Sequence, residues 1–252
     1  MESPQILVTG ATGGVGGAAV KWLESQGHRV AGLARDPRRA TFTTVRQGDY
    51  EDVDSLVNAL EGIDTLAFVS SDGDPVVMSR HHENMRRAVE RSEVHRVLYT
   101  GILDMDPESP FVYQPVHRDT EAWVLGGSWS GCSLRTSVFT EFFNSLIDRA
   151  RIGEVTRLPA EGKISVVDRI SVGHSLARLA LAATWERTIE YATGPVAQSI
   201  EALAAKTGVR LEPITVETYR ESLGRAGEPE WLVAALGSFF ESIARGGFAH
   251  VA

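Results

Sequence analysis

The first residues that could do chemistry lie in a glycine-rich turn near the N-terminus, with the sequence TGATGGVG. Three of its glycines have a steric reason to lack a side chain. Gly10 allows a tight turn, Gly13 lets the backbone approach a pyrophosphate, and Gly16 lets the helix pack closely on the strand. A plain turn is the alternative, since the chain has 24 glycines. The order strand, turn, helix favours a dinucleotide site. The residues expected to hold the cofactor there are Gly10, Thr12, Gly13, Gly14, Val15 and Gly16.

A second group follows the next expected strand, which ends in LARDPRR. Arg35 stands where proteins that bind NAD(H) usually place a carboxylate against the ribose. Its guanidinium could bind a 2'-phosphate, and Arg38 and Arg39 could add positive potential. We therefore expect NADP(H) rather than NAD(H). Two alternatives remain open: the arginines are solvated surface charges, or the carboxylate of Asp36 faces the ribose and favours NAD(H).

Further cofactor contacts are expected after the third and fourth strands. Asp49 and Tyr50, in GDYED, could meet the edge and the face of an adenine. Alternatively, Asp49 caps the helix that follows and Tyr50 is a packing residue. Ser70 and Ser71 end the fourth strand, at the sheet edge where ligands bind, although turn residues would look the same.

The chain lacks the tyrosine followed four residues later by lysine that ordinary short-chain dehydrogenases use as an acid or base. Its lysines are Lys21, Lys163 and Lys206, and none follows a tyrosine at that spacing. Reduction of a simple ketone needs a proton donor, whereas a quinone accepts hydride to give a delocalised phenolate that water can protonate. A quinone or similar conjugated acceptor therefore demands least of this chain.

The catalytic candidates are His117, Thr100 and Tyr113. His117 is expected in the first turn of a helix, where a neutral imidazole could hydrogen-bond a substrate oxygen and Glu121 is spaced to orient it. The alternative is a solvent-facing helix start. Thr100 ends the fifth strand, where its hydroxyl could touch nicotinamide or substrate, or simply pack. Tyr113 precedes His117 by four residues, but Pro115 intervenes and argues against a catalytic pair.

These residues need a scaffold of alternating strands and helices. Short apolar runs predict strands at Ile6–Val8, 29–34, 43–47, 64–70, 95–100 and 132–137, and apolar periodicity predicts helices at 15–26, 53–60, 76–92 and 140–151. This alternation predicts an α/β fold with a doubly wound parallel sheet, the Rossmann fold. We expect an NAD(P)-binding domain at 1–150 and a small interleaved substrate-covering subdomain at 151–252.

Composition limits the classes of partner. The net charge of -8 disfavours nucleic acid, and small molecules are the expected ligands. A single cysteine, Cys132, excludes an intrachain disulfide and suits a cytoplasmic location. We expect no export leader and no membrane span. His81 and His82 are adjacent and no Cys/His spacing suggests zinc, so no metal site is expected.

Taken together, these segments resemble the NmrA-like branch of the atypical short-chain dehydrogenases. The resemblance rests on TGATGGVG, ARDP, RQGDYED, FVSS, HHENMRRAVE, VLYTG, and HRDTE followed by SLRTSVFTEF, and SVVDRISVGHSLARLAL extends it. It implies a doubly wound fold with NADPH held by Gly10, Gly13, Gly16, Arg35 and Asp49. The substrate would lie over the nicotinamide near the fifth and sixth strands. His117 matches a histidine of the quinone-reductase members.

Members of this branch include quinone reductases, other small-molecule reductases and nucleotide-sensing regulators without catalytic activity. We therefore expect an NADPH-dependent reductase of a quinone or another conjugated carbonyl, which Phe139, Phe142, Phe143 and Tyr113 could help to bind. A non-catalytic NADP(H) sensor and a cofactor-retaining epimerase or lyase are the alternatives. The apolar segment WLVAALGSFFESIARGGF could cover the active site or form a homodimer.

Overall fold

The computed structural model describes residues 5–185 and 188–252, and their contacts divide them into two compact units. Residues 1–4, part of the stretch on which the expectation of no export leader rested, lie outside the described residues. Among the described residues, unit 1 comprises 5–101, 116–135, 169–185 and 188–191, and unit 2 comprises 102–115, 136–168 and 192–252.

Unit 1 is built on a sheet with the strand order β10-β6-β5-β4-β1-β2-β3. The bounds are β1 Ile6–Val8, β2 Val30–Ala34, β3 Val45–Gln47, β4 Thr65–Val69, β5 Arg96–Ile102, β6 Ser130–Thr136 and β10 Ile189–Ala192. β1 runs parallel to both β2 and β4, β2 to β3, and β4 to β5. This is the strand order of the Rossmann fold with one further strand at its edge, which confirms the predicted fold class.

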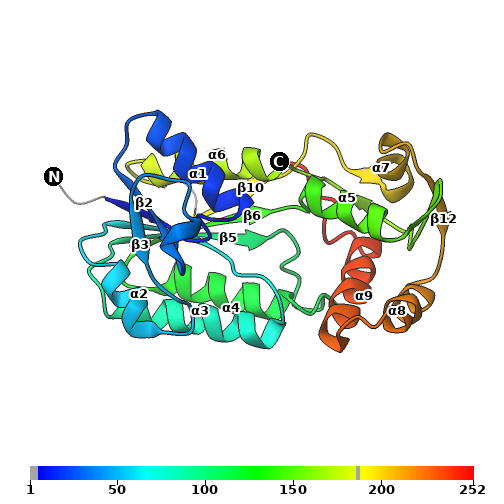
Figure 1. Cartoon of the computed structure of the whole chain (residues 1–252), viewed down its shortest axis with the longest axis horizontal. Helices are drawn as coiled ribbons and strands as arrows, with labels where there is room; N and C mark the ends of the chain where they lie inside the picture. The colour runs from blue at the N-terminus through cyan, green and yellow to red at the C-terminus, as the bar shows by residue number, and fades with distance from the viewer. Residues whose placement is uncertain (1–4, 186–187) are drawn as a thin grey trace. The chain divides into compact units, whose positions relative to one another are not determined.

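Helices cover both faces of this sheet. Their bounds are α1 Gly14–Ser25, α2 Val53–Ala59, α3 Pro75–Glu90, α4 Gln114–Gly126 and α6 Arg169–Leu181, with a short 3-10 helix at Pro37–Arg39. α1 and α6 lie on one face, and α2, α3 and α4 on the other (Figure 1). The sequence predictions for α1, α2 and α3 agree with these bounds to within two residues. Because the strands run parallel, their carboxyl ends bring the predicted site residues to one edge.

The core of unit 1 forms because its strands are apolar on both faces, as parallel strands covered by helices must be. β1 and β2 are buried along their whole lengths. The cluster between the sheet and the α2–α4 layer contains Leu7, Leu66, Phe68, Met85 and Tyr99. Tyr99 is fully buried, so its hydroxyl must find a partner inside the protein.

Unit 2 contains short strands and helices around a core of its own. Its elements are α5 Thr140–Arg149, β7 Arg151–Ile152, β8 Val155–Leu158, β9 Lys163–Ile164, β11 Gln198–Ser199, α7 Ile200–Lys206, β12 Arg210–Pro213, α8 Val216–Arg225 and α9 Glu230–Ala244. β12, β8 and β7 form a three-stranded sheet, and β11 pairs with β9. No helix among the described residues is long and apolar enough to cross a membrane.

Helix α9 corresponds to the apolar segment that was expected to cover the active site or join a second subunit. Phe239, Phe240 and Ile243 instead belong to the core of unit 2. Phe143, expected beside the substrate, is also buried in this core, and Phe142 packs edge-on against Phe239. The apolar face of α9 is thus used within the core of unit 2, and the homodimer stays a prediction.

The sequence analysis expected one boundary at residue 150, but the two units do not divide there. Residues 102–115 and 136–150 belong to unit 2, whereas α6 and most of β10 belong to unit 1. The reason is the return of the chain: α6 packs against α1, where Gly173 meets Val15 and Ala18, and β10 joins the sheet edge beside β6. The predicted interleaving is present, but it involves more crossings than one boundary can describe.

Candidate functional site

The glycine-rich turn forms a cradle of backbone between β1 and α1. Gly10 has a φ of 59°, a conformation that favours glycine. A Cβ on Gly16 would lie 2.5 Å from the carbonyl oxygens of both Gly10 and Thr9. Gly13 caps α1 without a side-chain hydrogen bond, and no acidic residue stands in the first turn. The amides that begin α1 therefore keep their capacity to bind phosphate.

The remaining predicted residues of the turn divide between surface and interior. Thr12, Gly13 and Gly14 are exposed, whereas Val15 is buried beneath the helix start. Val15 can therefore offer only its backbone to a ligand. This backbone cradle, with room that a Cβ would fill and orphan amides at a helix start, fits a dinucleotide pyrophosphate.

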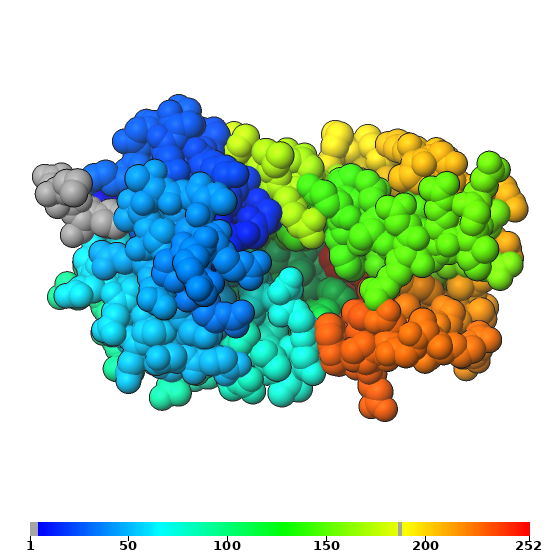
Figure 2. Space-filling model, in the orientation of Figure 1, coloured from blue at the N-terminus to red at the C-terminus, as the bar shows by residue number. Residues whose placement is uncertain are grey.

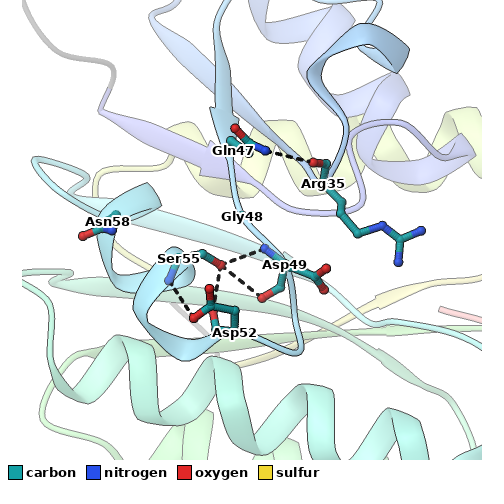
Figure 3. A pocket seen from close by; sticks show the side chains of 7 residues that line it. All are labelled: Arg35, Gln47, Gly48, Asp49, Asp52, Ser55 and Asn58. Atoms are coloured by element: carbon teal, nitrogen blue, oxygen red, sulfur yellow. Dashed lines mark hydrogen bonds between the residues drawn. The ribbon is translucent and has the colours of Figure 1, made fainter.

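A pocket of about 310 Å³ lies beside the carboxyl ends of β2 and β3. It is lined by Arg35, Gln47, Gly48, Asp49, Asp52, Ser55 and Asn58. Figure 3 shows Arg35 reaching out from the end of β2, opposite Asp49 and the start of α2. All lining residues come from the segment α1 to α2, whose blue surface faces the viewer in Figure 2.

Arg35 is the available cation of this pocket. The side chain is exposed, and the bond from Gln47 goes to the backbone carbonyl of Arg35, so it leaves the guanidinium donors unused. Asp36 is engaged elsewhere: it caps the 3-10 helix and receives two bonds of 2.9 Å from Arg38. These bonds lower the pKa of Asp36. The alternative in which Asp36 faces the ribose is therefore disfavoured, because Arg38 already occupies its carboxylate.

Asp49 and Tyr50 have different surroundings. Asp49 lines the pocket, and the capping role considered for it belongs to Asp52, which accepts bonds from the first amides of α2. The Tyr50 ring is stacked on His81 with 5.3 Å between centroids, and its hydroxyl donates to the carbonyl of Val69. His81 thus covers one face of the Tyr50 ring, and an adenine contact for Tyr50 stays a prediction. Asp49 keeps a carboxylate toward the space expected for adenine.

Ser70 and Ser71 follow β4 and contact two histidines of α3. Ser70 Oγ lies 3.2 Å from His82 Nε2, and Ser71 Oγ lies 3.3 Å from His81 Nδ1. The amide of Ser70 also donates to the hydroxyl of Thr100 over 3.2 Å. The structure therefore brings both serines and Thr100 to the same sheet edge, as expected, and adds a histidine layer behind them that the sequence analysis did not anticipate.

His117 lies in the first turn of α4, and Tyr99 is its partner. The phenol oxygen of Tyr99 is 2.6 Å from His117 Nδ1. Burial lowers the pKa of His117 to about 3, so the imidazole is neutral at physiological pH. The alternative of a solvent-facing helix start is disfavoured, because His117 is only 6% exposed. Sequence reasoning missed Tyr99. Successive strand residues face opposite sides of a sheet, so if Thr100 in VLYTG faces one side, Tyr99 must face the other, where a helix covers the sheet.

Glu121 does not orient His117. Its carboxylate accepts bonds of 2.6 and 2.9 Å from Arg135 and one of 2.7 Å from Ser133. This buried ion pair joins α4 to β6. The helical spacing that suggested a contact with His117 was real, but a guanidinium on the neighbouring strand is a stronger partner than a neutral imidazole.

Neutral histidines make stability depend on pH. Burial lowers the pKa of both His117 and His82, so below about pH 6.5 the unfolded chain binds protons that the folded chain does not. The unfolding free energy is expected to fall on acidification by about 1.4 kcal/mol per pH unit for each such histidine. Urea unfolding between about pH 7 and pH 5 checks this. His117→Gln should reduce the slope, and His28→Gln on an exposed turn should not.

In unit 2, Tyr113 directly precedes α4, the helix that carries His117, and Gln114 is the first residue of that helix. The Tyr113 ring meets Phe111 edge-on at 5.4 Å. Gln114 is 1% exposed, and among the described residues its Nε2 is the one buried side-chain nitrogen or oxygen without a hydrogen-bond partner. An unsatisfied buried amide costs about 1–3 kcal/mol. Gln114 is therefore a candidate ligand-binding residue that sequence reasoning missed.

Substitution of Gln114 by methionine tests this assignment. Methionine keeps the side-chain length and removes the orphan N–H, so the unfolding free energy of the free protein should stay the same or rise by about 1 kcal/mol. The KM for the acceptor should rise if the amide binds it. Urea unfolding and steady-state kinetics measure the two effects. A clear loss of stability would show that the amide has a structural partner instead.

No cluster of three or more metal-ligating side chains occurs among residues 5–185 and 188–252. His81 and His82, adjacent in α3, are each directed to different neighbours: His81 to Glu51 at 3.0 Å, and His82 to Thr120 at 2.8 Å. Both histidines are thus accounted for by protein contacts.

Comparison with known proteins agrees with this geometry. Residues 10–125 match an NAD(P)H-binding family. Quinone oxidoreductase 2 of Escherichia coli is 25% identical over 256 residues, covering 96% of this chain and 89% of that protein. An NmrA-like family domain-containing oxidoreductase of Aspergillus flavus is 24% identical over 222 residues, covering 82% and 72%.

The fold is shared with a solved structure that contains bound NADPH. The E. coli NADPH-dependent quinone oxidoreductase complexed with NADPH superimposes with a TM-score of 0.87 at 25% identity, covering 97% of this chain and 91% of that chain. The match extends over both units of the chain. The likeness therefore includes the segments beyond residue 190, which lie outside the motifs on which the sequence resemblance rests.

Proposed function

We propose that this chain is an oxidoreductase whose reductant is NADPH and whose acceptor is a quinone or another conjugated carbonyl compound. Its similarity to an NmrA-like oxidoreductase and to quinone oxidoreductase 2 supports this proposal. The observation that carries the proposal is the pairing of a neutral, buried histidine with a cofactor pocket that offers a free guanidinium.

NADPH is favoured over NADH by the charges at the end of β2. Arg35 offers a guanidinium without a side-chain partner among the described residues, at the place where the 2'-phosphate of NADPH would lie. Asp36, which could otherwise accept from a ribose hydroxyl, is occupied by Arg38. The carboxylate of Asp49 suits the amino group of adenine, because it can only accept hydrogen bonds.

The acceptor class follows from the hydrogen-bonding groups available. Bound NADPH supplies a hydride from its nicotinamide. His117 can donate a hydrogen bond to an acceptor oxygen but, with its low pKa, is not a store of protons near pH 7. Lys21, the only lysine among the described residues of unit 1, is exposed on α1 and forms no pair with a tyrosine. A quinone suits these groups, since its reduced oxygen is a stabilised phenolate that water can protonate.

A substrate panel tests the proposal. NADPH oxidation is followed optically with several quinones and with saturated ketones of matched size, beside a direct titration of NADPH binding. We expect quinones to react at least about 100-fold faster in kcat/KM, because only they dispense with a proton donor. Fast reduction of saturated ketones would refute the acceptor class. Tight binding of NADPH with no oxidation by any acceptor would favour a sensor or a non-redox enzyme.

The contact between His117 and the acceptor is tested by substitution. His117→Ala removes the donor and should lower kcat/KM for quinones about 10-fold to 100-fold while NADPH affinity changes less than threefold. His28→Ala is the matched control, on an exposed turn before β2. Equal activity of His117→Ala and wild type would exclude the contact.

A further inference from the structure

We propose that Tyr99 is a positioning residue that holds His117 in the tautomer carrying its proton on Nε2, so that the ring presents a fixed N–H donor to the acceptor. The inference rests on the proposed function, because it concerns how the same histidine meets the substrate. It assigns a role to a side chain that is fully buried and cannot touch the substrate itself.

The direction of the hydrogen bond follows from the two groups. Burial raises the pKa of the Tyr99 phenol, which therefore remains protonated and has one proton to place. The unprotonated nitrogen of a neutral imidazole accepts more strongly than a phenol oxygen, so the short 2.6 Å contact is best satisfied by Tyr99 O–H donating to Nδ1. A neutral ring that accepts at Nδ1 carries its proton at Nε2.

Tyr99 can impose this choice because its own position is fixed. Tyr99 belongs to β5, an interior strand that lies between β6 and β4. Its ring packs at 5.4 Å from the ring of Phe68 and edge-on at 5.9 Å from that of His82. A phenol held on a sheet strand has little freedom to turn. The hydroxyl therefore stays aimed at Nδ1 while substrate enters and leaves.

The helix that carries His117 is fastened to the same layer. The hydroxyl of Thr120 donates to the carbonyl of Val116 over 2.7 Å and so accepts from His82 Nδ1, 2.8 Å away. The other nitrogen of His82 faces Ser70 Oγ at 3.2 Å. This chain of contacts joins α4 through α3 to the end of β4, and it keeps the start of α4 in register with Tyr99.

The consequence concerns the unpartnered nitrogen. Nδ1 is the one atom of the His117 ring with a hydrogen-bond partner among the described residues, which leaves Nε2–H for the acceptor. As a hydride adds to a quinone, its electron pair forms the new bond and negative charge moves to the quinone oxygen. A donor fixed before the reaction stabilises that charge without reorganisation. Water then supplies the proton that completes the hydroquinone.

Nitrogen NMR of the histidine-labelled protein reads the tautomer directly, independently of activity. The wild type should show His117 with an unprotonated Nδ1 and a protonated Nε2. Tyr99→Phe should give a mixture of tautomers and about a tenfold loss of kcat/KM for a benzoquinone, with NADPH affinity within twofold of wild type. Tyr219→Phe, a buried tyrosine of unit 2, is the control and should change neither measurement.

Two results would overturn the inference: a wild-type His117 protonated on Nδ1, or a Tyr99→Phe protein with an undisturbed tautomer and full activity. If Tyr99→Phe fails to fold, the wild-type spectrum still decides the tautomer. Failure of the proposed function would look different, since the wild-type protein would then oxidise no NADPH whatever tautomer the spectrum shows.

Discussion

Replacing Gly16 with alanine is expected to raise the Kd for NADPH by about 100-fold or more. The added Cβ would lie 2.5 Å from two backbone carbonyl oxygens, those of Thr9 and Gly10. Neither oxygen can move without moving the end of β1 or the turn, and Gly10 is fixed at a φ of 59°. The cradle must therefore open, and its amides lose the positions that a pyrophosphate requires.

Calorimetric titration with NADPH measures this effect, and circular dichroism shows whether the variant is folded. Gly224→Ala in α8 is the matched control, because no atom lies within 4 Å of a Cβ added there. Helix propensity should make that control about 0.5–1 kcal/mol more stable, with unchanged binding. A Gly16→Ala protein that binds NADPH within threefold of wild type would show that the pyrophosphate does not lie in this turn.

Replacing Arg35 with alanine should remove most of the preference for NADPH over NADH. Hydrogen bonds from a guanidinium to a phosphate contribute about 1.5–3 kcal/mol, which corresponds to a rise of roughly 10-fold to 100-fold in the Kd for NADPH. NADH has no 2'-phosphate, so its Kd should change less than threefold. The ratio of the two dissociation constants reports on this one contact, because both cofactors share every other group.

Arg39→Ala provides the control, since Arg39 is an exposed neighbour outside the pocket. This substitution removes a charge that is screened by solvent, so it should raise the Kd for NADPH less than threefold. Arg38→Ala adds a further comparison, because it frees the carboxylate of Asp36 and should shift the preference toward NADH. If Arg35→Ala raised the Kd values for NADPH and NADH by the same factor, Arg35 would bind a part that the two cofactors share. The assignment of Arg35 to the 2'-phosphate would then be wrong.

The fold and the glycine-rich turn between β1 and α1 could be predicted because their signals are local. The apolar run Ile6–Val8, the glycines that follow and the helix of α1 are contiguous in the chain. Parallel strands buried on both faces leave few other arrangements for such a pattern. The tip position of Arg35 follows from the same unit, because it ends the second strand.

The surroundings of His117 could not be predicted, because they depend on contacts between distant segments. Tyr99 is separated from His117 by 18 positions, and His82 from Thr120 by 38. Helical spacing suggested Glu121 as the partner of His117, but tertiary packing gives that carboxylate to Arg135. Spacing shows which side chains share a helix face, whereas the strands beneath the helix decide which of them meet.

The points at which the chain passes from one unit to the other could not be predicted from the sequence either. The segment after α6 returns to the edge of the sheet at β10, an association between residues far apart in the sequence. The apolar residues of α9 indicated that this helix must be buried, but not by what. Its packing with Tyr219 and Phe248 depends on other elements of unit 2, whose own patterns are weak because they are short.

Anaerobic single-turnover mixing of the NADPH-loaded wild-type protein with a benzoquinone tests the central claim most directly. The nicotinamide absorbance should be lost in one exponential phase, and one hydroquinone should form for each NADPH oxidised. NADH at the same concentration should react more slowly because less of it is bound. NADPH that stays bound and unoxidised in the presence of the quinone would contradict the account.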